Sequence, residues 1–172
     1  MYIVEYYVQG ADLTSYTKYD EKQFPATIDA NVTADTTRVI TGYAYNAANT
    51  ENVLTGIVPA TGRLVLKVYY DRNTYNLTYK GAGSDHASFE VLYGTPVAEW
   101  PVPATNPVKE GSYFNGWSDA GYETMPASVV TISPIFVTET YKLNFVNTGD
   151  TTYGENNIIE VTYGSTFDGV DN

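Results

Sequence analysis

Hydrophobic and polar positions alternate along much of the chain with a period of two residues, which is typical of β-strands that bury one face. Segment 64–70 has the clearest alternation, and Lys67 falls on the side that we expect to be exposed. The residues on the side that we expect in the core are Leu64, Leu66, Val68 and Tyr70. The same pattern predicts strands at 2–8, 75–80, 88–93, 129–136, 141–146 and 158–163.

Helical periodicity is weak throughout the chain, because Gly, Pro or Thr interrupts every window in which apolar residues recur with a helical period. The best position for a short helix is 26–37, where Asp29 or Thr33 would cap a turn or two. Turn residues at Asn115 and Gly116 predict a break between strands. The expected class is therefore mainly β (α+β) with little helix.

Internal repeats organise the chain. Residues 75–79 (Tyr-Asn-Leu-Thr-Tyr) match 141–145 (Tyr-Lys-Leu-Asn-Phe), and residues 90–95 match 160–165, each with a Tyr-Gly pair. The N-terminal third follows the same plan more distantly, since its opening segment 2–6 also alternates and begins with Tyr. A shorter parallel relates the Gly-Tyr-Ala-Tyr-Asn and Gly-Ser-Tyr-Phe-Asn segments at 42–46 and 111–115.

These matches predict three repeats, at 1–72, 73–139 and 140–172, of which the last is incomplete. The connections at 71–74 and 138–140 are short, polar and free of Gly and Pro, so we expect them to leave neighbouring repeats little room to reorient. An elongated arrangement is the consequence that we expect.

The middle repeat resembles the Listeria-Bacteroides repeat, also called the internalin B-repeat. The resemblance rests on an opening strand, a Tyr-Gly pair at 93–94, a Pro-rich stretch at 101–107 and the segment 109–117 (Lys-Glu-Gly-Ser-Tyr-Phe-Asn-Gly-Trp). A Thr-Met-Pro-Ala closing segment begins at Thr124. Ser112 separates a glycine and a tyrosine that are usually adjacent in that family.

The first repeat resembles the mucin-binding-protein type of repeat that often precedes such modules. Segments 2–8, 42–45, 52–56 and 64–73 carry this second resemblance, although Asn46-Ala47 stands where a Gly-Trp element would be. Both families imply small β-grasp, ubiquitin-like folds arranged in tandem on secreted adhesins of the bacterial cell surface and cell wall.

The composition of the chain disfavours several classes of function. The 9 Lys and Arg residues stand against 20 Asp and Glu, for a net charge of −11, so nucleic-acid binding and attraction to anionic membranes are disfavoured. With no Cys and a single His, we expect no disulfide, no metal site and no cofactor. No basic leader or long apolar run is visible, so a secreted protein would have to be longer than this chain.

Catalytic chemistry has little support in the sequence. Residues Ser84, Asp85 and His86 are contiguous and cannot form a nucleophile–base–orienter chain, so we expect a solvated loop there. Segment 147–155 resembles a calcium loop only faintly, because its acidic residues are too widely spaced. We therefore expect that the protein is not an enzyme.

Two tryptophans are candidates for stacking on sugar rings. Trp117 lies in the glycine-tryptophan element and is expected to pack within its own repeat. Trp100, in a Pro-rich loop, is the candidate ligand-binding residue, with packing onto its own repeat as the alternative.

The sequence thus predicts an extracellular stalk or spacer with weak adhesive contacts to host or matrix glycans or proteins. The alternative is a specific glycan- or mucin-binding module. We further expect that segment 140–172 cannot fold alone. Its exposed edges would be satisfied by packing on the middle repeat, by pairing with another copy of the chain as a consequence of truncation, or not at all, and we favour the pairing.

Overall fold

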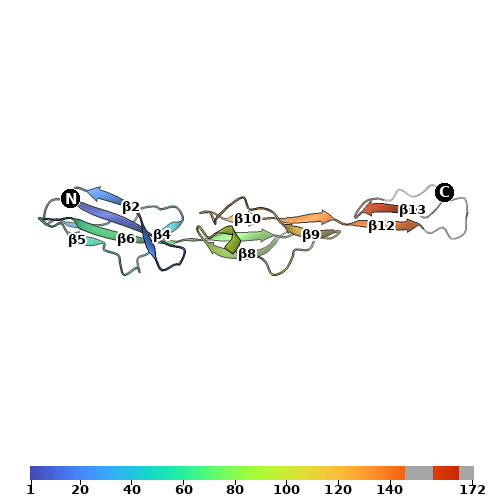
Figure 1. Ribbon diagram of the computed structural model, residues 1–172, viewed down its shortest axis with the longest axis horizontal. Coiled ribbons are helices and arrows are strands. Elements are labelled where there is room, and N and C mark those ends of the chain that lie inside the picture. The colour runs from blue at the N-terminus through green and yellow to red at the C-terminus, as the bar shows by residue number, and fades with distance from the viewer. Residues whose placement is uncertain (146–156, 167–172) are drawn as a thin grey trace, which may run out of the picture. The chain divides into compact units, whose positions relative to one another are not determined.

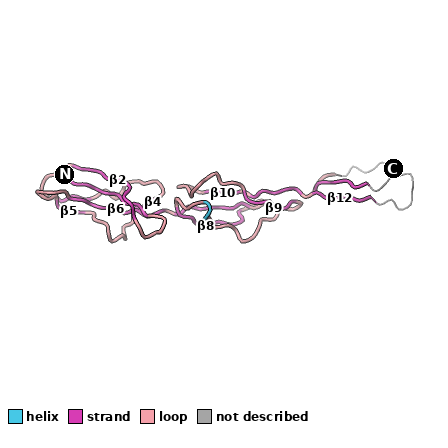
Figure 2. The backbone as a smooth tube through the Cα atoms, in the orientation of Figure 1, coloured by secondary structure: helices cyan, strands magenta, loops and turns pink. Residues whose placement is uncertain are grey.

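Strands account for nearly all the regular structure of the chain (Figures 1 and 2). The computed structural model describes residues 1–145 and 157–166. Within these ranges the only helical element is a 3₁₀ turn, η1 (Val97–Glu99). The predicted mainly β class is confirmed, whereas the β-grasp architecture remains a prediction.

The helix predicted at 26–37 is wrong. In its place, strand β3 (Asn31–Thr33) pairs antiparallel with β5 (Thr55–Ile57). Asp29 has a left-handed φ of 63°, which a helix does not allow. The Asp35 carboxylate then accepts hydrogen bonds from the backbone N–H and hydroxyl of Thr37, at 2.8 and 2.7 Å. Such local bonds compete with helical ones.

The first repeat is built on a mixed sheet of order β2-β1-β6-β4. Strand β1 (Tyr2–Gln9) pairs antiparallel with β2 (Tyr16–Phe24) and parallel with β6 (Leu64–Arg72). Strand β4 (Tyr43–Tyr45) pairs antiparallel with the end of β6. β2 was not predicted, because most of its residues are polar and exposed on this outer strand.

The inner face of this sheet forms the core, as the alternation predicts. Its buried residues are Val4, Tyr6, Val8, Ala34, Ile40, Leu66, Val68 and Tyr70, with Leu64 packed against them. The opposite face differs from expectation, because Tyr69 is also buried and stacks on Tyr7 with ring centroids 4.8 Å apart. Lys67 is consequently half-buried rather than exposed, and its ammonium group lies 5.8 Å from the centroid of the Tyr7 ring.

The middle repeat contains two small sheets. One has the order β10-β7-β8, from β7 (Thr74–Lys80), β8 (Asp85–Leu92) and β10 (Val130–Ile132). In the other, β9 (Ser112–Trp117) pairs antiparallel with β11 (Pro134–Thr138). The strand predicted at 129–136 is therefore two strands, because Pro134 has no N–H with which to continue the ladder.

The turn predicted at Asn115 and Gly116 is also wrong, since both residues lie inside β9. The β9–β11 register places Pro134 opposite Trp117 but Phe136 opposite Phe114, so β9 carries one extra residue there. A β-bulge of this kind accommodates the turn-favouring pair within the strand.

Trp117 packs within the middle repeat, as expected. Its ring lies edge-on to Tyr79 and Phe114, with centroid distances of 4.8 and 5.1 Å, and it is half-buried. In the last part of the chain, β12 (Thr140–Phe145) and β13 (Asn157–Thr162) form an antiparallel pair.

The chain divides into two compact units. One contains residues 1–77, 89–101 and 121–130, and the other contains 78–88, 102–120 and 131–172. This division follows contacts rather than repeated sequence, so the repeat boundaries at 1–72, 73–139 and 140–172 stay a prediction.

The hydroxyl of Tyr70 is buried without a hydrogen-bond partner among the described residues. The side chain is 1% exposed, and burial raises the pKa of its phenol from 10.0 to about 12. Because folding favours the neutral phenol, this contribution to stability is complete below pH 10 and is lost as the pH rises towards about 12.

We predict that Tyr70→Phe leaves the free energy of unfolding unchanged at pH 7 or raises it by about 1 kcal/mol, because an unsatisfied buried hydroxyl is removed. It should also reduce the loss of stability above pH 10. Chemical denaturation at both pH values measures the two effects. A loss of more than about 1 kcal/mol at pH 7 would show that the hydroxyl is hydrogen-bonded after all.

Candidate functional site

The first of two equivalent joints is formed by Asn73, the single residue between β6 and β7. Its backbone N–H donates to the carbonyl of Gly42 at 2.9 Å, and its carbonyl accepts from the N–H of Tyr93 at 2.8 Å. Gly42 precedes β4, and Tyr93 follows β8. Both polar groups of the joint residue are therefore bound, on one side by the first repeat and on the other by the second.

The second joint repeats this geometry at Glu139, the single residue between β11 and β12. The N–H of Glu139 donates to the carbonyl of Gly111 at 2.9 Å, and its carbonyl accepts from the N–H of Tyr163 at 2.9 Å. Gly111 precedes β9, and Tyr163 follows β13. In the described part of segment 140–172, Tyr163 therefore contacts the middle repeat, which corresponds to the first of the three alternatives expected for this segment.

The side chains around the two joints differ. At the first joint, the Arg72 guanidinium donates to the carbonyl of Tyr93 at 2.6 Å and to the Thr95 hydroxyl at 3.0 Å. Thr138 occupies the corresponding position at the second joint, opposite Ser112 in the β9–β11 ladder. There the hydroxyl of Tyr163 donates to the Glu110 carboxylate at 2.5 Å, which raises the pKa of the Tyr163 phenol.

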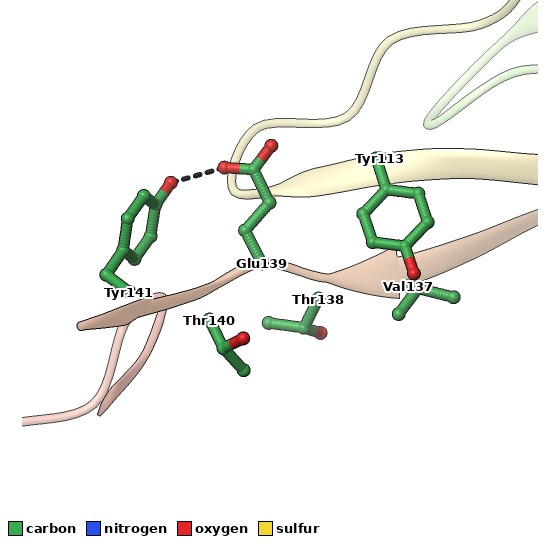
Figure 3. Close-up of a pocket in the computed structure, with 6 residues that line it drawn as sticks. All are labelled: Tyr113, Val137, Thr138, Glu139, Thr140 and Tyr141. Carbon is green, nitrogen blue, oxygen red and sulfur yellow. Dashed lines mark hydrogen bonds between the residues drawn. The ribbon is translucent and has the colours of Figure 1, made fainter. Parts of the chain in front are cut away.

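A groove adjoins the second joint (Figure 3). It has a volume of about 500 Å³ and is lined by Tyr113, Val137, Thr138, Glu139, Thr140 and Tyr141. The two tyrosines are exposed, and the Tyr141 hydroxyl donates to the Glu139 carboxylate, which raises the pKa of the Tyr141 phenol. The groove thus offers exposed aromatic rings, hydroxyls and a carboxylate, a set suited to a polar ligand.

Trp100, the predicted ligand-binding residue, is 6% exposed, and its indole N–H donates to the carbonyl of Thr95 at 2.9 Å. This packing onto its own repeat corresponds to the alternative considered above. A role of Trp100 in ligand binding stays a prediction.

The loop expected at Ser84-Asp85-His86 is wrong for its last two residues, because Asp85 and His86 begin strand β8 and their side chains contact other residues. Asp85 pairs with Lys80 at 2.5 Å, while His86 Nε2 lies 2.7 Å from the carbonyl oxygen of Thr105. The calcium-like segment 147–155 falls outside the described residues. In the part of the chain that is described, no group of His, Asp and Glu residues is arranged to hold a metal ion.

The only described helix has three residues, so no described helix has the length or apolarity needed to cross a membrane.

The residues of the joints were visible in the sequence only as parts of the internal repeat. The Tyr-Gly pairs and the segments that begin at Gly42 and Gly111 recur along the chain. A recurring pattern does not show which residues come into contact, so the hydrogen bonds at the joints could not be derived from it.

Comparisons with known proteins give matches among solved structures alone. No protein-family model matches the chain, and no curated protein sequence matches it. Among solved structures, the chain is similar to the type 2 repeat of the mucus binding protein MUB from Lactobacillus reuteri, with 13% identity and a TM-score of 0.28. The match covers 81% of this chain and 100% of that one. At this level the similarity carries no argument, and the Listeria-Bacteroides resemblance stays a prediction.

We predict that Arg72→Ala lowers the free energy of unfolding by roughly 1.5 to 3 kcal/mol, the range for hydrogen bonds made by charged groups. Arg63→Ala is the matched control, because Arg63 is exposed and its removal should cost no more than about 0.5 kcal/mol. Urea denaturation measures both variants. Equal effects would mean that the guanidinium contacts contribute nothing to the joint.

Proposed function

We propose that the chain is an extracellular repeat region of a bacterial cell-surface protein and acts as a stalk or spacer, without enzymatic activity. The observation that carries the proposal is the bonding of the joint residues. Asn73 and Glu139 each use both backbone polar groups to hold the preceding and the following repeat. A spacer needs this property, because a joint that rotates freely cannot hold another domain at a distance.

The shortness of the connections supports the same function. With one residue between strands, a change in the orientation of a repeat has to be absorbed by very few backbone dihedrals. Any large change would also break the two hydrogen bonds of the joint residue. The joint is therefore expected to resist bending, unlike a flexible Gly- and Ser-rich linker.

Charge and sequence resemblance support an extracellular location. The net charge of −11 favours solubility and repulsion between copies, which suits a surface crowded with identical chains. The resemblances to the Listeria-Bacteroides and mucin-binding types of repeat imply a bacterial surface protein. Weak adhesive contacts to host or matrix ligands would gain strength from repetition through effective concentration.

We predict that spin labels on either side of the first joint report a narrow distribution of distances. Val39→Cys and Val129→Cys provide the sites, because both side chains lie in one compact unit, they are 91% and 62% exposed, and the chain has no native Cys. Pulsed electron paramagnetic resonance measures the distribution. A variant with Gly-Ser-Gly-Ser inserted after Asn73 is the flexible control, and equal widths in the two proteins would contradict the spacer function.

A second candidate function, contact with glycans, is favoured by the groove beside Glu139. Its exposed Tyr113 and Tyr141 rings offer faces on which a sugar ring can pack, and Glu139 offers a hydrogen-bond acceptor. The first joint has Ala44 at the position matching Tyr113 and Asn73 at that of Glu139. The groove is therefore particular to the second joint, unlike the stalk geometry that both joints share.

If the groove binds glycans, Tyr113→Ala should reduce binding to a glycan array at least about tenfold, equivalent to about 1.4 kcal/mol. Tyr122→Ala is the matched control, because Tyr122 is also an exposed tyrosine of the middle repeat but does not line the groove. Absence of binding by the parent protein, or equal losses in the two variants, would reject the glycan function and leave the stalk unaffected.

A further inference from the structure

A glycine at each joint lies directly against a tyrosine ring from the following repeat. A Cβ atom added to Gly42 would overlap the Cγ, Cδ1 and Cε1 atoms of Tyr93. A Cβ atom added to Gly111 would overlap the same three ring atoms of Tyr163. The two rings therefore occupy the space that a side chain would fill, and the same three ring atoms come nearest at both joints.

Both glycines also have left-handed φ angles, of 82° at Gly42 and 65° at Gly111. Left-handed backbone does not by itself bring a ring over a glycine. Gly62 and Gly121 have φ angles of 86° and 71°, and a Cβ on either would meet no atom within 4 Å. The close approach is thus a separate feature that coincides with the joints.

The backbone around each contact is the same at both joints. The residue after each glycine closes a turn. The N–H of Tyr43 donates to the carbonyl of Ile40 at 3.0 Å, and the N–H of Ser112 donates to the carbonyl of Lys109 at 3.2 Å. On the tyrosine side, the chain turns sharply after the ring. The N–H of Thr95 donates to the carbonyl of Leu92, and the N–H of Ser165 donates to the carbonyl of Thr162, each at 3.1 Å.

We propose that Gly42 and Gly111 are sockets that bind the tyrosine of a Tyr-Gly corner in the following repeat. The occupant is an aromatic side chain of a repeat of this kind, because at both joints ring atoms lie where a Cβ atom would be, while the N–H of the same tyrosine bonds the joint carbonyl. This inference deepens the spacer function and rests on it, since it names the contact that holds successive repeats together.

The two sockets differ in what they require of the ring. At the first, the Tyr93 ring also meets the edge of Tyr43, with centroids 5.5 Å apart. A phenylalanine would make the same contact. At the second, the tyrosine hydroxyl is bonded to Glu110, so a phenylalanine would lose that hydrogen bond. The first socket is selective for aromatic rings, and the second is selective for tyrosine.

A double-mutant cycle at the first socket tests the proposal in the full chain. Gly42→Ala introduces both left-handed strain and the overlap with Tyr93, whereas Gly62→Ala introduces strain alone. Strain alone should lower the thermal midpoint by roughly 2 to 8 °C. We expect Gly42→Ala to cost more than Gly62→Ala in the parent protein, but about the same once Tyr93→Ala has removed the ring.

Additive effects of Gly42→Ala and Tyr93→Ala would overturn the proposal. A cycle of Gly111→Ala with Tyr163→Ala, controlled by Gly121→Ala, repeats the test at the second socket. Variants that alter only the tyrosine avoid glycine strain if Gly42→Ala does not fold. Tyr93→Phe should keep the thermal midpoint and Tyr93→Ala should lower it, and equal midpoints for these two variants would also overturn the proposal.

The spin-label pair separates failure of the socket from failure of the spacer. With Cys at positions 39 and 129, Tyr93→Ala should broaden the distance distribution and Tyr93→Phe should leave it unchanged. A narrow parent distribution that Tyr93→Ala does not broaden rejects the socket while the spacer stands. A parent distribution as broad as that of the Gly-Ser insertion rejects the spacer, and the mutant cycle then decides separately whether the ring binds the glycine.

Discussion

Both joints of this protein depend on one peptide geometry, in which a single residue between two strands is hydrogen-bonded in both directions. At Asn73 the N–H is bound by Gly42 and the carbonyl by Tyr93, so neither polar group is available for another conformation. Breaking either bond would expose a backbone group that has to find water or a new partner. The strands on either side are therefore positioned by the same residue that connects them.

This constraint links each joint to the strand ladder beside it. Strand β4 ends its ladder with Tyr43 opposite Arg72, immediately before the joint, and β9 does the same with Ser112 opposite Thr138. Each pairing brings the preceding glycine carbonyl to the joint N–H. The hydrogen bond at the joint is thus an extension of the ladder rather than a separate contact.

The sequence was most informative where burial alternates along a strand, and least informative where geometry depends on residues distant in the chain. Strands β1, β6 and β7 follow from their apolar pattern, and Leu66, Val68 and Tyr70 are buried as expected. Strand β2 is polar, so its sequence has no apolar alternation that would predict a strand. It is a strand because it pairs with β1. For the joints, the sequence shows only that certain residues recur. The contact between Gly42 and Tyr93 cannot be read from it, because this contact exists only after both repeats have folded.

The internal repetition also acts as a natural substitution experiment on the joint. Between the first joint and the second, Arg72 is replaced by Thr138, Asn73 by Glu139 and Tyr43 by Ser112. The two backbone hydrogen bonds remain, at 2.8 to 2.9 Å, and so does the ring over the glycine. Because three neighbouring side chains change while these features persist, the geometry cannot depend on the Arg72 guanidinium or the Tyr43 ring. It depends on the backbone, the glycine and the tyrosine, whereas the surrounding side chains adjust how strongly each joint is held.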